Sequence, residues 1–151
     1  MPKKTSTYTG ITGRDAGKIY HLTECDVRDN FKIGMMLANA IIPKKQVKLD
    51  GEEIELGIQP EYESLEGVTD WLITNESAIY AGDVQVTTDA ILLLIEKCVL
   101  KHELNGIVYI ANQGYDTAMC EEKSSILELF FALLRLHSVR FAQDFTVAGG
   151  R

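Results

Sequence analysis

The sequence predicts an α+β fold that is mostly helical, in which an N-terminal β-hairpin is followed by three to four packed helices. Three observations support this prediction. Residues 6–24 place strand-forming side chains on both sides of a glycine-containing turn. Several later segments repeat apolar residues at helical spacing. One of these segments, 124–145, is apolar around more than half of its circumference, so we expect the other helices to pack around it.

The chain of 151 residues fits a single domain, residues 1–151. Within it we expect the hairpin over residues 1–24 and a mainly helical part over 25–151. A polar stretch at 43–61 is broken by glycines and a proline, and it predicts a loop or hairpin insertion. No internal repeat divides the chain further.

The first element is the hairpin around GRDAGK, where Gly13 and Gly17 can adopt positive φ. The same letters resemble a phosphate-binding loop. However, only three residues separate the two glycines instead of four, and Ile19 stands where that loop carries a hydroxyl that binds magnesium. The following residues also favour a strand and not a helix. The segment therefore predicts a turn without a nucleotide.

The next element is a helix that begins near Thr23, a plausible N-cap, and ends at Pro43. Beyond it, Asp50–Gly51 is a strong turn pair and favours a short hairpin over 47–56. Residues 65–73 predict a short helix. Residues 87–100 predict another, with Thr87 or Thr88 as its N-cap. Asn105–Gly106 then marks a second turn pair before a strand at 107–111.

The last predicted helix, 124–145, begins after a serine cap at Ser124 or Ser125. Two interpretations fit its wide apolar arc: a central core helix, or a helix that is partly core and partly a docking or self-association surface. His137 and Arg140 lie close to the apolar arc and are either helix-end cations or polar contacts in an interface. On the second interpretation the predicted partner-binding residues are Phe130, Phe131, Leu134, His137, Arg140 and Phe141.

The acidic composition of the chain makes some classes of binding partner unfavourable. A net charge of −7 and a pI of about 4.9 oppose binding to nucleic acid and to anionic membranes. The N-terminus lacks the apolar run of a secretory signal, so we expect a cytoplasmic protein.

The sequence predicts no catalytic, cofactor or metal site. The three cysteines, Cys25, Cys98 and Cys120, match no zinc-ligand spacing, and we expect free thiols. The histidines are scattered, and neither a serine nor a cysteine stands in a known nucleophile motif. The acidic pairs favour solvated loops or first helical turns over acid–base catalysis.

Two blocks of the sequence together resemble the tail assembly chaperones of long-tailed bacteriophages and prophages. The first block is ITGRDAGKIYHLTE, residues 11–24, which continues into the helix at DNFKIGMMLANAI. The second block is LLRLHSVRF, residues 133–141. Residues 43–120 depart from the family pattern, and KQVKLDGEEIEL resembles an insertion.

The resemblance implies a protein that is not an enzyme. Such chaperones bind the tape-measure protein and keep it soluble while tail-tube subunits polymerise around it, and some have a longer frameshifted form that recruits the tube protein. The resemblance thus implies a protein that works in the host cytoplasm, with the tape-measure protein, the tail-tube protein or a second copy of this chain as partners. The alternative is a structural morphogenesis protein, such as a tail completion or head–tail joining subunit retained in the virion.

Overall fold

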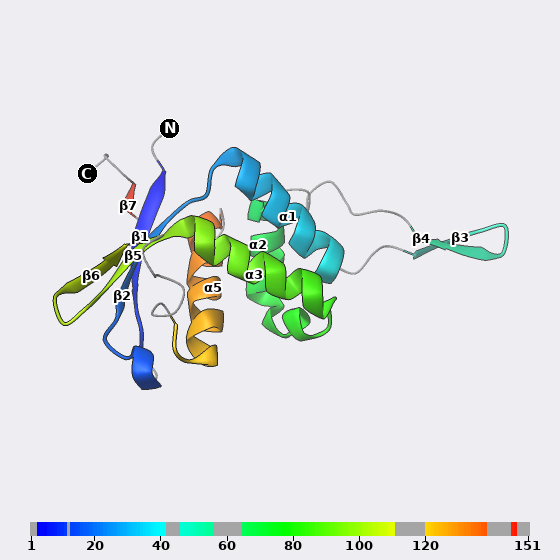
Figure 1. Ribbon diagram of the computed structural model, residues 1–151. Helices are drawn as coiled ribbons and strands as arrows, with labels where there is room; N and C mark the ends of the chain where they lie inside the picture. The colour runs from blue at the N-terminus through cyan, green and yellow to red at the C-terminus, as the bar shows by residue number, and fades with distance from the viewer. Residues whose placement is uncertain are drawn as a thin grey trace.

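Among the residues that the structure describes, an antiparallel sheet forms one layer and four α-helices lie on one side of it (Figure 1). The computed structural model describes residues 3–11, 13–41, 46–55, 65–110, 120–138 and 146–147. The described elements are β1 (Lys4–Thr9), η1 (Gly13–Asp15), β2 (Ile19–Thr23), α1 (Val27–Ile41), β3 (Gln46–Leu49), β4 (Glu52–Glu55), α2 (Leu65–Thr74), η3 (Glu76–Tyr80), α3 (Val84–Cys98), β5 (Val99–Leu104), β6 (Ile107–Ile110), α5 (Lys123–His137) and β7 (Thr146–Val147). The α+β class predicted from the sequence is confirmed.

The two predicted hairpins form, at residues 6–24 and 47–56, and the structure adds a third hairpin between β5 and β6 that was not predicted. β1 pairs with β2 around the GRDAGK turn. Asp50–Gly51 joins β3 to β4 with φ values of 53° and 82°, and Asn105–Gly106 joins β5 to β6 with φ values of 53° and 81°. Two successive residues with positive φ are the requirement of a type I′ turn, which is why the Asp–Gly and Asn–Gly pairs were both correctly predicted as turns.

The expected order of an N-terminal hairpin followed by three to four packed helices is matched only in part, because β5 and β6 join the sheet of the N-terminal hairpin. The strand order of the main sheet is β6-β5-β2-β1-β7. A row of stacked rings ties the two hairpins together: His102 on β5 lies 5.6 Å from the ring centre of Tyr20 on β2 and 4.8 Å from that of Tyr109 on β6. Val99 takes extended backbone (φ −99°, ψ 107°), so the helix predicted over 87–100 ends at Cys98.

Helix starts also differ from the prediction. α1 begins at Val27, where the Asp26 carboxylate accepts a hydrogen bond from the Asp29 amide, while Thr23 ends β2. α3 begins at Val84, three residues before Thr87, the first of the two predicted caps. It begins there because the Asp83 carboxylate accepts a hydrogen bond from the Val86 amide. Aspartate is as good an N-cap as threonine, so the choice between neighbouring caps was open in the sequence.

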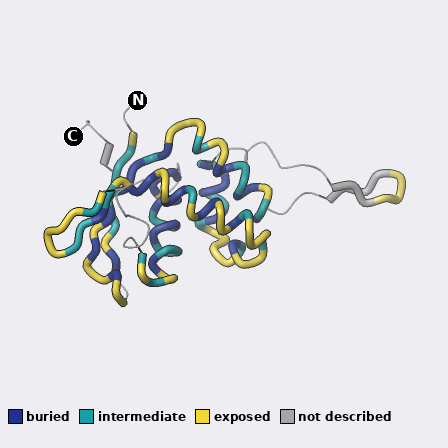
Figure 2. Tube along the Cα trace, in the orientation of Figure 1, coloured by how far each residue is buried: buried dark blue, intermediate teal, exposed yellow. Residues whose placement is uncertain are grey.

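Helix α5 is the centre of the molecule. It contacts β1 and β2 on the sheet side and α2 and α3 on the helical side, while α1 packs on α2 and α3. It ends at His137, before extended backbone at Ser138 (φ −71°, ψ 138°), and the rest of the helix predicted over 124–145 lies outside the described residues. Buried residues gather where these layers meet (Figure 2). The largest fully buried side chains are Tyr20, Ile33, Leu37, Leu65, Leu72, Leu94, Ile95, Leu129, Phe130, Leu133, Leu134 and Leu136.

Candidate functional site

The GRDAGK segment turns the chain, as predicted, and is built around a carboxylate. The Gly10 amide donates to the Lys18 carbonyl at 2.8 Å, and the Gly17 amide donates to the Gly10 carbonyl at 2.9 Å. Gly13 and Gly17 take φ values of 51° and 87°. Asp15 is fully buried inside this turn. A buried carboxylate at that place repels phosphate, which supports the prediction of a turn over that of a nucleotide loop.

The Asp15 carboxylate joins the first hairpin to the start of α5. It accepts the amide of Glu121 at 2.9 Å and the amide of Glu122 at 2.8 Å, and it pairs with the buried Lys18 ammonium at 2.8 Å. Burial raises the pKa of Asp15, but the hydrogen bonds from Lys18 and the two amides outweigh it and bring that pKa down to about 2. The carboxylate therefore stays charged at neutral pH.

A groove of about 340 Å³ lies between α5, β1, the turn after β1 and the start of η3. Leu127, Phe131 and Ala132 of α5 line it and are half-buried. Tyr8 of β1 and Ile11 of the turn complete its apolar surface, and the Ile11 side chain is 73% exposed. We call these five residues the α5 groove.

Charged residues line the same groove. Glu76, Glu128 and Arg135 contribute to its lining, and Arg135 pairs loosely with Glu76 across 3.8 Å. The Tyr8 hydroxyl donates to Glu128 at 2.6 Å, which fixes the tyrosine against α5. Burial and this hydrogen bond to a carboxylate raise the pKa of Tyr8 well above its usual value, so the hydroxyl remains a donor.

The structure separates the six predicted partner-binding residues. Phe131 lies in the α5 groove. Phe130, Leu134 and His137 have at most 1% of their surface exposed, so they are core residues and this part of the prediction is corrected. They are buried because α5 packs against the sheet on one side and against α2 and α3 on the other. Arg140 and Phe141 lie outside the described residues.

His137 is held by two hydrogen bonds. Its Nδ1 donates to the Leu133 carbonyl at 2.8 Å, and its Nε2 accepts the Cys25 amide at 3.1 Å. At the end of α5 the ring therefore bonds a neighbour, as in the first interpretation, but it does so as a neutral imidazole and not as a cation. Sequence analysis gave no role to Cys25, which lies 112 positions from His137 along the chain.

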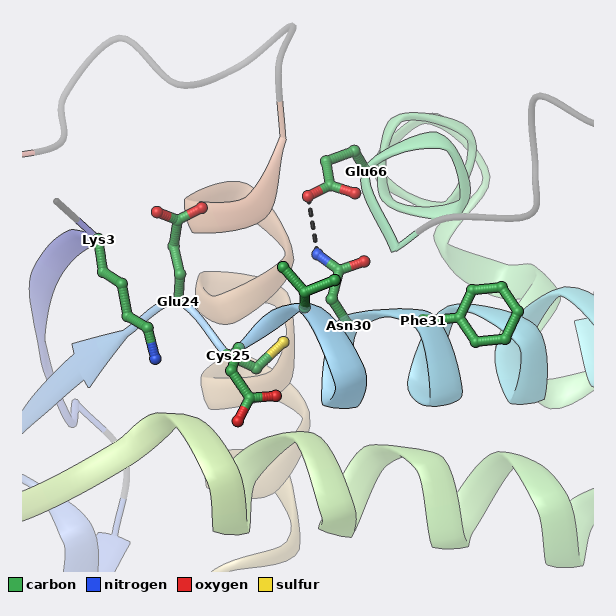
Figure 3. Close-up of a pocket in the computed structure, with 8 residues that line it drawn as sticks. Lys3, Glu24, Cys25, Asn30, Phe31 and Glu66 are labelled. Carbon is green, nitrogen blue, oxygen red and sulfur yellow. Dashed lines mark hydrogen bonds between the residues drawn. The ribbon is translucent and has the colours of Figure 1, made fainter. Parts of the chain in front are cut away.

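A second hollow, of about 530 Å³, lies beside the start of α1 (Figure 3). Cys25 lines it together with the charged Lys3, Glu24 and Glu66 and the exposed ring of Phe31. The Asn30 side chain donates to Glu66 at 2.7 Å and so ties α1 to the beginning of α2. Sequence spacing gave no signal for this hollow, because its lining comes from the residue before β1, the β2–α1 link, the first turns of α1 and the start of α2.

Searches of protein-family models, curated proteins and solved structures found no match to the chain. Among the described residues, no helix has both the length and the apolar character needed to cross a bilayer.

Proposed function

We propose that this protein is a tail assembly chaperone of a long-tailed phage, which binds an apolar helix of the tape-measure protein and keeps that protein soluble while the tail tube polymerises. The observation that carries the proposal is the α5 groove. It is an accessible apolar surface on the very helix that was predicted to have more apolar circumference than its own domain covers. Binding, without catalysis, is the activity we assign.

The two sequence blocks that resemble the chaperone family lie side by side in space at this groove. Ile11 opens the first block and Arg135 belongs to the second, and both line the groove. The contacts of Asp15 and Arg14 with Glu121 and Glu122 hold the first block against the start of α5. This arrangement supports the view that the blocks form one functional unit.

The groove suits an apolar helix face. Phe131 and Leu127 lie one turn apart on α5, so they can contact residues spaced by three or four positions on a partner helix. Completing the burial of such side chains contributes up to about 1.5–3 kcal/mol each. Arg135 and the carboxylates of Glu76 and Glu128 leave charged groups beside the apolar floor, as at the rims of other protein interfaces.

The test is co-expression with the tape-measure protein encoded by the same phage. We expect the tape-measure protein to be insoluble alone and soluble with this chain, and to co-purify with it. Phe131→Ser should reduce the soluble, co-purified fraction at least tenfold. Phe31→Ser is the matched control, since Phe31 is 60% exposed on α1 and lies outside the groove. Thermal melts of both variants establish that they are folded.

Two results would overturn the proposal. One is a tape-measure protein that stays insoluble in the presence of this chain. The other is stoichiometric recovery of this chain from purified virions by mass spectrometry, which would favour the alternative of a tail completion or head–tail joining subunit. Two further measurements test the other partners expected in the host cytoplasm. Co-purification with the tail-tube protein tests binding to that protein, and the molar mass of the free chain in solution tests self-association.

A further inference from the structure

Three potential metal ligands from distant parts of the chain meet in the interior. Cys25 lies in the link between β2 and α1, Cys98 is the last residue of α3, and His137 is the last residue of α5. One ligand atom from each lies within 4.8 Å of the other two. All three residues are buried, with exposed fractions of 8%, 0% and 1%. We propose that Cys25, Cys98 and His137 bind a zinc ion.

The ligand types and spacing fit zinc. Zn²⁺ binds thiolate sulfur at about 2.3 Å and imidazole nitrogen at about 2.0–2.1 Å, and tetrahedral angles then place sulfur and nitrogen about 3.5 Å apart. The Cys25 Sγ lies 3.4 Å from the His137 Nε2. Two thiolates and a neutral imidazole give a centre without net charge around Zn²⁺, which limits the cost of burying it.

The histidine is already oriented as a ligand. Because its Nδ1 donates to the Leu133 carbonyl, the lone pair is on Nε2, the atom that faces Cys25. A metal-binding histidine almost always donates its second nitrogen to a carbonyl or carboxylate in this way. On binding, the metal replaces the Cys25 amide as the partner of Nε2.

We place the fourth position on the Cys25 side, because neither Cys98 nor His137 lines the hollow beside α1. Cys25 also lines the hollow beside α1, which is wide enough to admit water (Figure 3). A water molecule from this hollow completes a tetrahedral site. The ion would join the β2–α1 link to the ends of α3 and α5. Its role is therefore to stabilise the fold.

The primary experiment uses the full-length protein purified under reducing conditions without chelators. Elemental analysis should find about one zinc per chain. After zinc is removed, titration with cobalt(II) should produce sulfur-to-cobalt charge-transfer absorption together with the visible bands of a tetrahedral ion. A protein that takes up no metal, or a cobalt spectrum without sulfur ligation, overturns the proposal regardless of any variant.

Variants assign the ligands. Cys25→Ser and Cys98→Ser should each weaken cobalt binding by more than the roughly 100-fold that loss of a supporting group costs. Cys120→Ser is the matched control, because the Cys120 thiol lies apart from the cluster, 3.9 Å from the Tyr20 hydroxyl. It should bind cobalt as the wild type does, and equal loss in all three variants overturns the assignment. Circular dichroism of each variant separates loss of a ligand from loss of the fold, and zinc should raise the Tm of the wild type and of Cys120→Ser alone.

Discussion

Replacing the small Asp15 side chain should cause a large loss in the free energy of unfolding. Its carboxylate neutralises a buried ammonium and binds two backbone amides before α5. Removing one member of a buried ion pair costs about 3–5 kcal/mol, because the other charge stays in a poorly solvated place. Asp15→Asn should therefore lower the free energy of unfolding in urea by about 3 kcal/mol.

The control for Asp15→Asn is Asp89→Asn. Asp89 is exposed on α3 and bonds only to Gln85 among the hydrogen bonds that the described residues show for it. A surface change of this kind costs less than about 0.5 kcal/mol. Similar losses for the two variants would contradict the role we give to Asp15.

The same carboxylate predicts a pH dependence. The folded protein holds the pKa of Asp15 at about 2, below its ordinary value of 3.8. The folded state therefore binds this proton less tightly than the unfolded chain does. The contribution of Asp15 to stability is complete above about pH 5 and is lost as the pH falls toward about 2, and it amounts to about 2 kcal/mol.

Urea denaturation of the wild type and of Asp15→Asn between pH 2 and pH 7 measures this effect. The difference in unfolding free energy between the two proteins should be constant at neutral pH and shrink below about pH 5. A difference that stays constant down to about pH 2 would show that the Asp15 carboxyl titrates alike in both states.

At the scale of elements, two glycines in different hairpins allow a matched comparison. A Cβ on Gly10 would collide with the backbone oxygen of Asp15, whereas a Cβ on Gly106 would meet no atom within 4 Å. Gly10→Ala must push the GRDAGK turn away from β1, and we expect it to cost about 2–3 kcal/mol. Gly106→Ala meets only the strain of its positive φ and should cost about 1 kcal/mol.

Thermal and urea unfolding of the two variants measure these costs. The order of the two losses is the informative result, since both variants add one methyl group to a hairpin. If Gly106→Ala were the more destabilising, the close packing of the turn would not be important to stability.

Elements that depend on a few adjacent residues could be predicted from the sequence. Elements that depend on contacts between distant segments could not. Asn105–Gly106 and Asp50–Gly51 specify their turns within two residues, so both turns followed from the sequence, although only the hairpin at Asp50–Gly51 was predicted as such. The pairing of β5 with β2 depends on the rings of Tyr20 and His102, which lie far apart in the chain. No local pattern could place that second hairpin in the sheet.

Over the whole molecule, the same distinction holds for the candidate site. The apolar arc of α5 was visible in the sequence, but which part of it stays accessible depends on α2, α3 and the sheet. Phe130 and Phe131 are adjacent and chemically identical, yet one is buried in the core and the other lines the groove. The cluster of Cys25, Cys98 and His137 likewise had no signature, because its members share no short spacing.

The central position of α5 predicts cooperative unfolding. The helix contacts both the sheet and the other helices, so neither layer keeps its core without it. Trp71, the single tryptophan, lies on α2 at the opposite side of α5 from the sheet. Its fluorescence and the far-ultraviolet circular dichroism should give the same urea midpoint, and two separate midpoints would indicate layers that unfold independently.

The bond between Asp15 and the Glu121 amide also sets an order of events during synthesis. A ribosome makes the first hairpin early, but the amides that satisfy its buried carboxylate emerge only after four fifths of the chain. Until then the inner surface of the sheet and the apolar sides of α2 and α3 have no α5 to cover them. The nascent chain must therefore expose apolar surface during most of its translation. Its fold is completed only when segments that are far apart in the sequence come into contact.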